Sequence, residues 1–138
     1  MNQLREEDLR PPVRDFFEKQ NYTVTDEVKL FGRDIDIVAK RKSRVITVEL
    51  KLYDWKRAIQ QAYLNLRVAD YSFIALPESV LGRISRKVYS EAYDSGIGLL
   101  CVDGYAKQIM KPMPSQRVQP ILRRMFFKNL REKKDFGL

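Results

Sequence analysis

The chain has 138 residues, 44% of them hydrophobic, and a net charge of +8. This length and composition predict a globular fold, organised as one domain over residues 1–138. The absence of histidine excludes Ser-His-Asp and Cys-His catalysis and His-ligated zinc, and the single cysteine, Cys101, excludes an intrachain disulfide and a thiolate metal cage. No apolar run approaches the length of a membrane span, and the first residues lack the hydrophobic segment of a signal peptide, so we expect a cytoplasmic protein without a membrane partner.

The N-terminal part predicts a helix followed by a strand. Pro11 and Pro12 are typical of a helix start, with Asp8 as the expected cap, and the apolar residues that follow recur at helical spacing. Asn21 is expected to end this helix. Residues 22–31 then alternate as a β-strand does.

Residues 33–52, RDIDIVAKRKSRVITVELKL, predict a β-hairpin whose turn is centred on Lys42 and Ser43. In this register Asp36 faces Glu49 and Asp34 faces Lys51. Opposed residues share one face of a sheet, so the four polar side chains should gather in one patch. The apolar residues expected to face the core are Ile35, Ile37, Ala39, Ile46, Val48, Leu50 and Leu52.

The rest of the chain alternates helices with strands. Asp54 is a plausible N-cap for a helix that continues to about Leu66, and a buried strand is expected at residues 71–76. The later elements are expected as a helix at 78–95, strands within 96–104 and 105–111, and a terminal helix at 117–134. This order predicts a mixed α/β sheet with flanking helices.

The polar patch of the hairpin indicates a cation site. Two opposed carboxylates repel each other unless a positive charge lies between them, and Lys51 can neutralise only one of them. Oxygen ligands without nitrogen or sulfur favour Mg²⁺ or Mn²⁺, a combination suited to phosphodiester hydrolysis. The alternative is an ordinary salt-bridged strand surface with an Asp34–Lys51 pair. Two aspartates inside one strand violate β-propensity, which favours the functional interpretation.

The segments GRDIDIVAK (32–40), VELKL (48–52) and QQAY (60–63) resemble the PD-(D/E)XK phosphodiesterase superfamily, which includes restriction endonucleases, Holliday-junction resolvases and Mrr-like nucleases. The resemblance implies a restriction-endonuclease-like core of a helix, three antiparallel strands, a helix and a strand. That core would cover about residues 11–76. A basic C-terminal extension would cover about residues 105–138.

The resemblance also implies roles for the residues of the patch. Asp36 and Glu49 would bind Mg²⁺ or Mn²⁺ together with the backbone carbonyl of Leu50. Lys51 would position or activate the attacking water. Asp34 is additional to the family's pattern. We expect it to accept a hydrogen bond from Lys51, with a second metal or plain solvation as the alternatives.

Two supporting residues are expected by the same resemblance. Gln61, in the helix after the hairpin, would support the site, although the tyrosine that part of the superfamily has four residues later is Asn65 here. An acid of the first helical segment would also join the metal ligands, with Glu7 as the first choice and Glu6 as the second.

The positive charge predicts a polyanionic partner, with nucleic acid as the leading candidate. Residues 105–138 contain nine Lys or Arg against two Asp or Glu. The expected phosphate contacts lie at the hairpin tip and on the terminal helix: Lys40, Arg41, Lys42 and Arg44, and Arg123, Arg124 and Lys128. An ordinary solvated surface is the alternative, and the apolar residues of the terminal helix are expected to pack on the body or on a second subunit.

These observations predict a Mg²⁺-dependent DNA endonuclease, an enzyme of DNA repair or defence. Its sequence specificity should be low, or its specificity should come from DNA structure or a partner protein. A homodimer would supply two sites for two strands. One alternative is a catalytically inactive nucleic-acid-binding or regulatory module of the same fold. A ribonuclease is another, since no residue pattern separates DNA from RNA.

Overall fold

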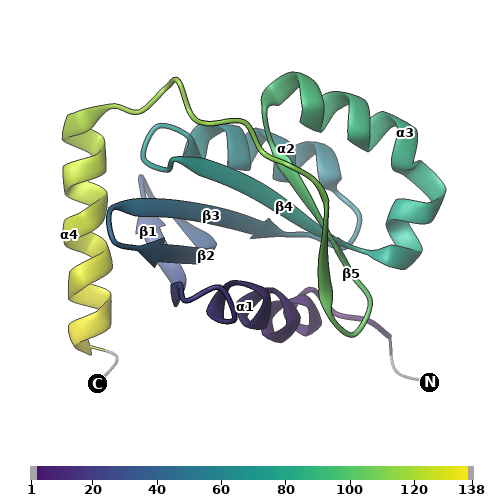
Figure 1. The fold of residues 1–138 in the computed structure, drawn as a ribbon, viewed down its shortest axis with the longest axis horizontal. Helices are drawn as coiled ribbons and strands as arrows, with labels where there is room; N and C mark the ends of the chain where they lie inside the picture. Colours follow the sequence, from purple (N-terminus) through teal and green to yellow (C-terminus); the bar gives the residue numbers. More distant parts are fainter. Residues whose placement is uncertain (1–2, 137–138) are drawn as a thin grey trace.

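The structure is a computed structural model that describes the backbone of residues 3–136 and the side chains up to residue 133 (Figure 1). A short 3₁₀ helix, η1, spans Glu6–Leu9. The α-helices are α1 (Arg10–Glu18), α2 (Trp55–Asn65), α3 (Glu78–Ser95) and α4 (Pro120–Phe136). The strands are β1 (Thr23–Leu30), β2 (Arg33–Arg41), β3 (Arg44–Leu50), β4 (Tyr71–Pro77), β5 (Gly98–Val102) and β6 (Ala106–Met110).

The six strands form one sheet in the order β1-β2-β3-β4-β5-β6. The first three strands are antiparallel, β3, β4 and β5 run parallel, and β6 returns antiparallel to β5. The parallel neighbours are joined through α2 and α3, because a parallel pair needs a crossover connection. The expected mixed α/β sheet with flanking helices is confirmed, as is the order helix, three antiparallel strands, helix and strand.

The helix ends follow from local chemistry, with one departure from expectation. The carboxylate of Asp54 accepts a hydrogen bond from the backbone N–H of Arg57 (3.2 Å), so Asp54 caps α2 as expected. Gly96 ends α3 in the left-handed conformation (φ 73°). The expected cap of α1 is wrong: Leu9 stands at that position, and Asp8 instead accepts from the backbone N–H of Arg5 (2.8 Å) within η1.

Helices cover both faces of the sheet (Figure 1). On one face, α1 packs Val13 and Phe17 on the apolar residues of β2, β3 and β4. On the other face, α2 and α3 pack against β4 and β5 through a second cluster that includes Trp55 and Val88. The other face of the hairpin is covered by a third cluster, in which Val38 and Val45 pack with Phe126 of α4, so both faces are buried and the strand register is fixed.

Helix α4 lies across the β1 end of the sheet (Figure 1). Phe126 and Leu130 are 0% and 3% exposed and join a third core cluster with Val28 and Ile35. The expectation that the apolar face of this helix packs on the body is thus confirmed for these two residues. In the part of the chain that the structure describes, we find no helix with the length and hydropathy needed to cross a bilayer.

Candidate active site

The hairpin of β2 and β3 has the expected register. The strands join at a two-residue turn of Lys42 and Ser43, and the ladder runs from the pair Arg41–Arg44 to the pair Ile37–Val48. One residue further on, the carboxylate of Asp36 accepts a hydrogen bond from the backbone N–H of Leu50 (Oδ2–N 2.8 Å). Asp36 therefore lies at the end of β3, beside Glu49 and Leu50.

An irregular position of β1 lies opposite Asp36. Glu27 has a left-handed backbone (φ 55°), and the pairs Asp26–Ile37 and Val28–Ile35 flank it. A left-handed residue other than glycine within a strand is uncommon and changes the local direction of the ribbon. The expectation that Ile35 shares the core face of Ile37 is wrong, because beyond this position Ile35 packs in the cluster of α4.

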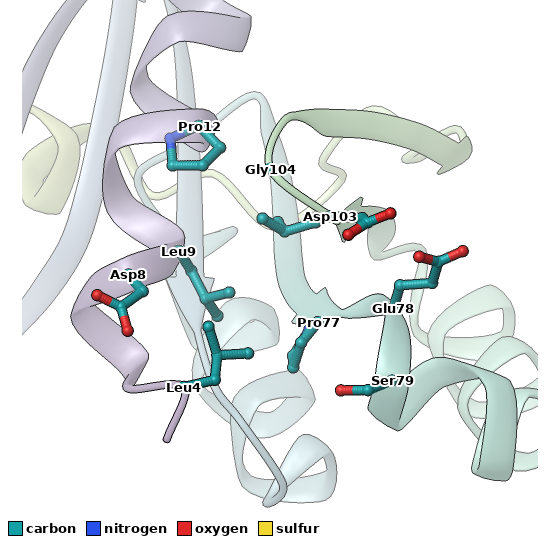
Figure 2. A pocket seen from close by; sticks show the side chains of 10 residues that line it. Leu4, Asp8, Leu9, Pro12, Pro77, Glu78, Ser79, Asp103 and Gly104 are labelled. Atoms are coloured by element: carbon teal, nitrogen blue, oxygen red, sulfur yellow. The ribbon is translucent and has the colours of Figure 1, made fainter. Parts of the chain in front are cut away.

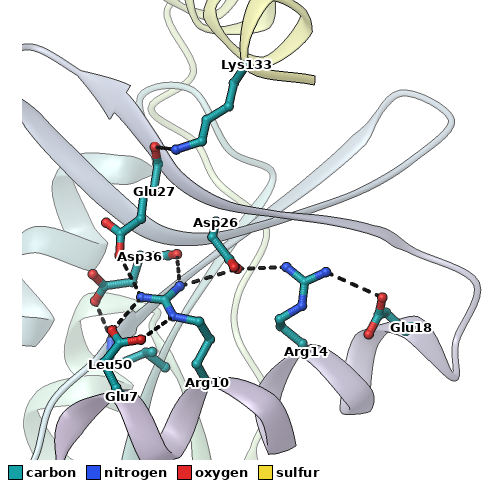
Figure 3. A network of polar contacts seen from close by, with 9 residues as sticks. All are labelled: Glu7, Arg10, Arg14, Glu18, Asp26, Glu27, Asp36, Leu50 and Lys133. Atoms are coloured by element: carbon teal, nitrogen blue, oxygen red, sulfur yellow. Dashed lines mark hydrogen bonds and ion pairs between the residues drawn. The ribbon is translucent and has the colours of Figure 1, made fainter. Parts of the chain in front are cut away.

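Arg10 holds this irregular position in place (Figure 3). Its guanidinium donates to the backbone carbonyl of Asp36 (2.6 Å), to Glu27 (2.7 Å) and, through two nitrogens, to both oxygens of Glu7 (3.0 and 3.1 Å). It also lies 3.3 Å from the carboxylate of Asp26, and its side chain is only 11% exposed. The first helix is thereby joined to the backbone of the residue that carries the first site carboxylate.

Glu49 is the most buried acid of the site, with 2% of its surface exposed. Its Oε2 accepts hydrogen bonds from Asn65 of α2 (2.8 Å) and from Arg33 of β2 (3.3 Å). Arg33 also donates to the side-chain oxygen of Asn65 and to the backbone carbonyl of Gln61 (3.1 Å). These bonds compensate part of the cost of removing a carboxylate from water.

The Glu49 carboxyl titrates near neutral pH. Burial and, next to it, the negative charge of Asp36 raise its pKa from 4.5 to about 7, against the lowering effects of Asn65 and Arg33. The influence of Asp36 shows that the two carboxyls are close enough to interact. Paired carboxyls with a shifted pKa are typical of functional sites.

Glu6, not Glu7, is the acid of η1 that faces the site. Burial raises the pKa of Glu6, the charge of Asp36 raises it too, and the charge of Lys51 lowers it, so Glu6 lies near both groups. Glu7 is turned to Arg10, whose hydrogen bonds lower the pKa of Glu7. Both oxygens of Glu7 are engaged by Arg10, and the expectation that an acid of this segment joins a metal site stays a prediction.

Lys51 follows the end of β3. Its backbone N–H donates to the carbonyl of Ala75 in β4 (3.2 Å), which fixes the start of its half-buried side chain. Among the described residues, no hydrogen bond or ion pair joins it to Asp34, so the contact expected there is not formed. Since the β2–β3 ladder ends at Ile37, Asp34 instead lies opposite Lys29 of β1, with Nζ and Oδ1 3.9 Å apart.

Gln61 is half-buried on α2 and lines a cavity of about 490 Å³ that Arg33 also lines. Its contact with the site runs through its backbone carbonyl, which accepts a hydrogen bond from Arg33. Asn65, one helical turn further on, supplies the side-chain contact to Glu49. The helix therefore supports the site at the position where part of the resembled superfamily has a tyrosine.

Some of the cations expected to contact nucleic acid make contacts within the protein, and the others are exposed. Arg41 stacks on Tyr22 and donates to the carbonyl of Gln20 (2.7 Å), Arg44 lies over Tyr71, and Lys40 donates to the carbonyl of Lys42 (2.6 Å). Arg123 is held by the carbonyls of Val68 (2.9 Å) and Ser43 (2.7 Å) and by Asp70 (3.1 Å). Lys42, Arg124 and Lys128 are exposed. Arg123 is thus a structural residue that attaches α4 to the sheet.

The oxygens available to a cation come from two strands. Because Asp36 Oδ2 and Glu49 Oε2 accept hydrogen bonds, the oxygens that could hold a cation at the end of β3 are the second oxygen of each carboxylate and the carbonyl of Leu50. Among the described residues, no group of three or more Asp, Glu, Cys or His side chains is arranged to hold a metal ion. Two carboxylates with a backbone carbonyl and water are nevertheless a donor set that suits Mg²⁺.

A separate cavity of about 430 Å³ lies between η1, β4 and β5 (Figure 2). Its walls are apolar residues such as Leu4 and Pro77, together with the acids Asp8, Glu78 and Asp103. Asp103 raises the pKa of Glu78, so the two carboxyls interact. Neither a lysine nor an arginine is among the residues that line this cavity, so its charge does not suit a polyanion.

The sequence alone does not predict the roles of Arg10, Arg33 and Asn65. Arg33 directly precedes the two aspartates of β2. Asn65 lies four residues after Gln61, where part of the resembled superfamily has a tyrosine. These two positions are therefore the ones at which the sequence offers a polar partner for Glu49. Arg10 gives no such signal, because its contacts with Glu27 and with the carbonyl of Asp36 reach across 17 and 26 residues of sequence.

Comparisons with known proteins assign no family. Neither a protein-family model nor a curated protein sequence matches the chain. Among solved structures, the fold is similar to that of SfsA from Pyrococcus furiosus, solved in complex with Ca²⁺, with a TM-score of 0.40 and 15% identity over 78% of this chain. The chain spans 59% of the length of that protein. This likeness is too distant to assign a function.

Proposed function

We propose that the chain is a Mg²⁺- or Mn²⁺-dependent endonuclease that hydrolyses phosphodiester bonds in DNA. The observation that carries the proposal is the burial of the Glu49 carboxyl, 2% exposed, within the electrostatic influence of Asp36. Two carboxyls that repel each other, one of them buried, lower the stability of the fold. A function that needs both acids explains why they lie together.

The residues at the end of β3 fit a hard divalent cation. Asp36, Glu49 and the carbonyl of Leu50 would hold it, and when bound it would stabilise the negative charge that develops on the scissile phosphate. Lys51 would direct its ammonium hydrogens at the attacking water and at the phosphate. Glu6, which interacts with Lys51, would help to orient the ammonium group.

Arg10 would act as a positioning residue in this site. It donates to the carbonyl of Asp36 while the side chain of Asp36 accepts from the backbone of Leu50. The acid is therefore held from both its backbone and its carboxylate. Support from both ends reduces the movement of the Asp36 carboxylate before the cation binds.

Among the described residues, no element resembles an added sequence-reading module, and we propose low sequence specificity or direction by DNA structure or a partner protein. Two copies of the chain would be needed to cut both strands in one event, which makes a homodimer part of the proposal. An inactive nucleic-acid-binding module is the second candidate. It is favoured by the Arg33–Glu49 ion pair, which places a protein cation on a site carboxylate.

A cleavage panel separates these candidates. Supercoiled plasmid, linear duplex, a flap, a four-way junction and RNA would be incubated with purified protein and Mg²⁺ or Mn²⁺, with chelator as the control. The endonuclease proposal expects metal-dependent cutting of DNA that is lost in Lys51→Ala. Binding of these substrates without any cutting would favour the inactive module, and cutting of RNA alone would favour a ribonuclease.

A further inference from the structure

An open groove runs between α2 and the start of β2. It has a volume of about 490 Å³ and is lined by Arg33, Asp54, Lys56, Arg57, Gln60, Gln61 and Leu64. Three of these side chains are cations, and the one acid, Asp54, is already used as the N-cap of α2. The groove therefore offers positive charge and amide donors to an anionic ligand.

The exposed side of α2 extends this surface. Lys56, Gln60 and Leu64 follow one another at spacings of four residues and form one stripe along the helix, and Arg67 lies in the turn that follows the helix. Arg67 lies 5.2 Å from the ring centroid of Phe31, which is 57% exposed. Exposed aromatic rings beside cations are typical of surfaces that bind nucleic acid.

Arg33 connects the groove to the candidate active site. One nitrogen of its guanidinium lies 3.3 Å from Oε2 of Glu49, and the other donates to the carbonyl of Gln61 in the wall of the groove. A ligand in the groove therefore lies next to the carboxylates at the end of β3. A phosphate that binds Arg33 would compete with Glu49 for the same guanidinium.

We propose that this groove binds the phosphodiester backbone of DNA beside the bond that is cut, with Lys56 and Arg57 on adjacent phosphates and Arg33 nearest the site. This inference rests on the proposed function. It adds a contact surface on α2 to the exposed cations of the other expected surfaces, such as Lys42 and Arg124, whereas Arg123 is engaged by the carbonyl of Ser43. Charge complementarity and the shared residue Arg33 are the observations that select this partner.

The test compares two adjacent pairs of exposed helical cations. Lys56→Gln/Arg57→Gln removes two charges from the groove, and Arg86→Gln/Lys87→Gln removes two from the exposed side of α3. Binding of a fluorescein-labelled duplex would be measured by anisotropy in chelator, at several salt concentrations. We expect the groove variant to bind roughly tenfold more weakly, with a salt slope smaller by about two, and the α3 variant to bind like wild type.

An equal loss in both variants, or no loss in the groove variant, would overturn the inference. So would binding of RNA of the same sequence with no binding of DNA. Because the assay contains no metal, it does not depend on cleavage. If the protein binds DNA through the groove but never cuts it, the proposed endonuclease activity is contradicted and the groove assignment is not.

Discussion

The guanidinium of Arg33 lies 3.3 Å from the carboxylate of Glu49, and this ion pair joins a 2% exposed acid to the rim of an open groove. Asn65 completes the support of the same oxygen at 2.8 Å. The charge of the other site carboxylate, that of Asp36, raises the pKa of Glu49. The stability of the fold and the state of the site are therefore linked through one carboxyl group.

Replacing Glu49 by glutamine should stabilise the protein at alkaline pH. The pKa of Glu49 is raised in the fold from 4.5 to about 7, so the native state binds this proton more tightly than the unfolded state. Wild type should therefore lose stability as pH rises from about 4.5 to about 7, and no more above that range. The loss corresponds to about 3 kcal/mol, which Glu49→Gln should recover at pH 8.

Urea unfolding of both proteins at pH 5 and pH 8 in chelator measures this difference. The two proteins should have similar free energies of unfolding at pH 5, where Glu49 is already protonated in the fold. Asp15→Asn, which removes an exposed acid of α1, serves as a control with no expected change in the pH profile. A Glu49→Gln variant that is less stable than wild type at pH 8 would contradict the account.

Added Mg²⁺ or Mn²⁺ should raise the thermal midpoint of wild type at pH 8, because a ligand that binds only the native state stabilises it. The rise should be absent in Glu49→Gln, which keeps the shape of the side chain without its charge. Differential scanning fluorimetry across a series of metal concentrations measures the effect. A midpoint shift of equal size in both proteins would place the cation elsewhere.

Arg10→Ala should lower the free energy of unfolding by about 2 kcal/mol, since it leaves the Asp36 carbonyl, Glu7 and Glu27 without their donor, while Asp26 keeps Arg14. The matched control is Lys19→Ala, which breaks the exposed Lys19–Asp15 pair of the same helix and should cost about 0.5 kcal/mol or less. Urea unfolding of both variants tests this. Equal costs would show that the Arg10 network is an ordinary surface pairing.

Arg123 and Arg124 are adjacent in α4 and should behave differently. Arg123→Ala should destabilise the protein by about 2 kcal/mol, because its guanidinium donates to two backbone carbonyls and to Asp70. Arg124→Ala should change stability by about 0.5 kcal/mol or less, since Arg124 is exposed. Thermal unfolding of the two variants is the measurement, and a reversed order would refute the structural role of Arg123.

The hairpin and its carboxylates could be predicted from the sequence because they depend on residues that are close together along the chain. Alternation of apolar and polar residues sets which side chains share a face, and the turn at Lys42 and Ser43 sets the register. Together these place Asp36 beside Glu49 without knowledge of the rest of the chain. The helices were predicted for a similar reason, since Pro11 and Asp54 mark their starts.

The partners of the carboxylates could not be predicted in the same way. Arg10, Arg33 and Asn65 reach the site through tertiary packing. No sequence pattern distinguishes them, as partners of the carboxylates, from the many other polar residues of the chain. The left-handed conformation of Glu27 has no sequence signal either, because glycine or asparagine is the usual residue at such a position. This conformation is what separates Ile35 from the core face of Ile37.

The most direct test of the central claim is nicking of supercoiled plasmid by Asp36→Asn beside Asp34→Asn, with Mg²⁺ and with chelator. The two variants remove the same charge from the same strand, but only Asp36 lies at the end of β3, whereas Asp34 is exposed opposite Lys29. The account predicts that Asp36→Asn reduces nicking by a factor of about 100 or more and that Asp34→Asn nicks at a rate close to wild type. Metal-dependent nicking that survives Asp36→Asn, or that is lost equally in both variants, would contradict it.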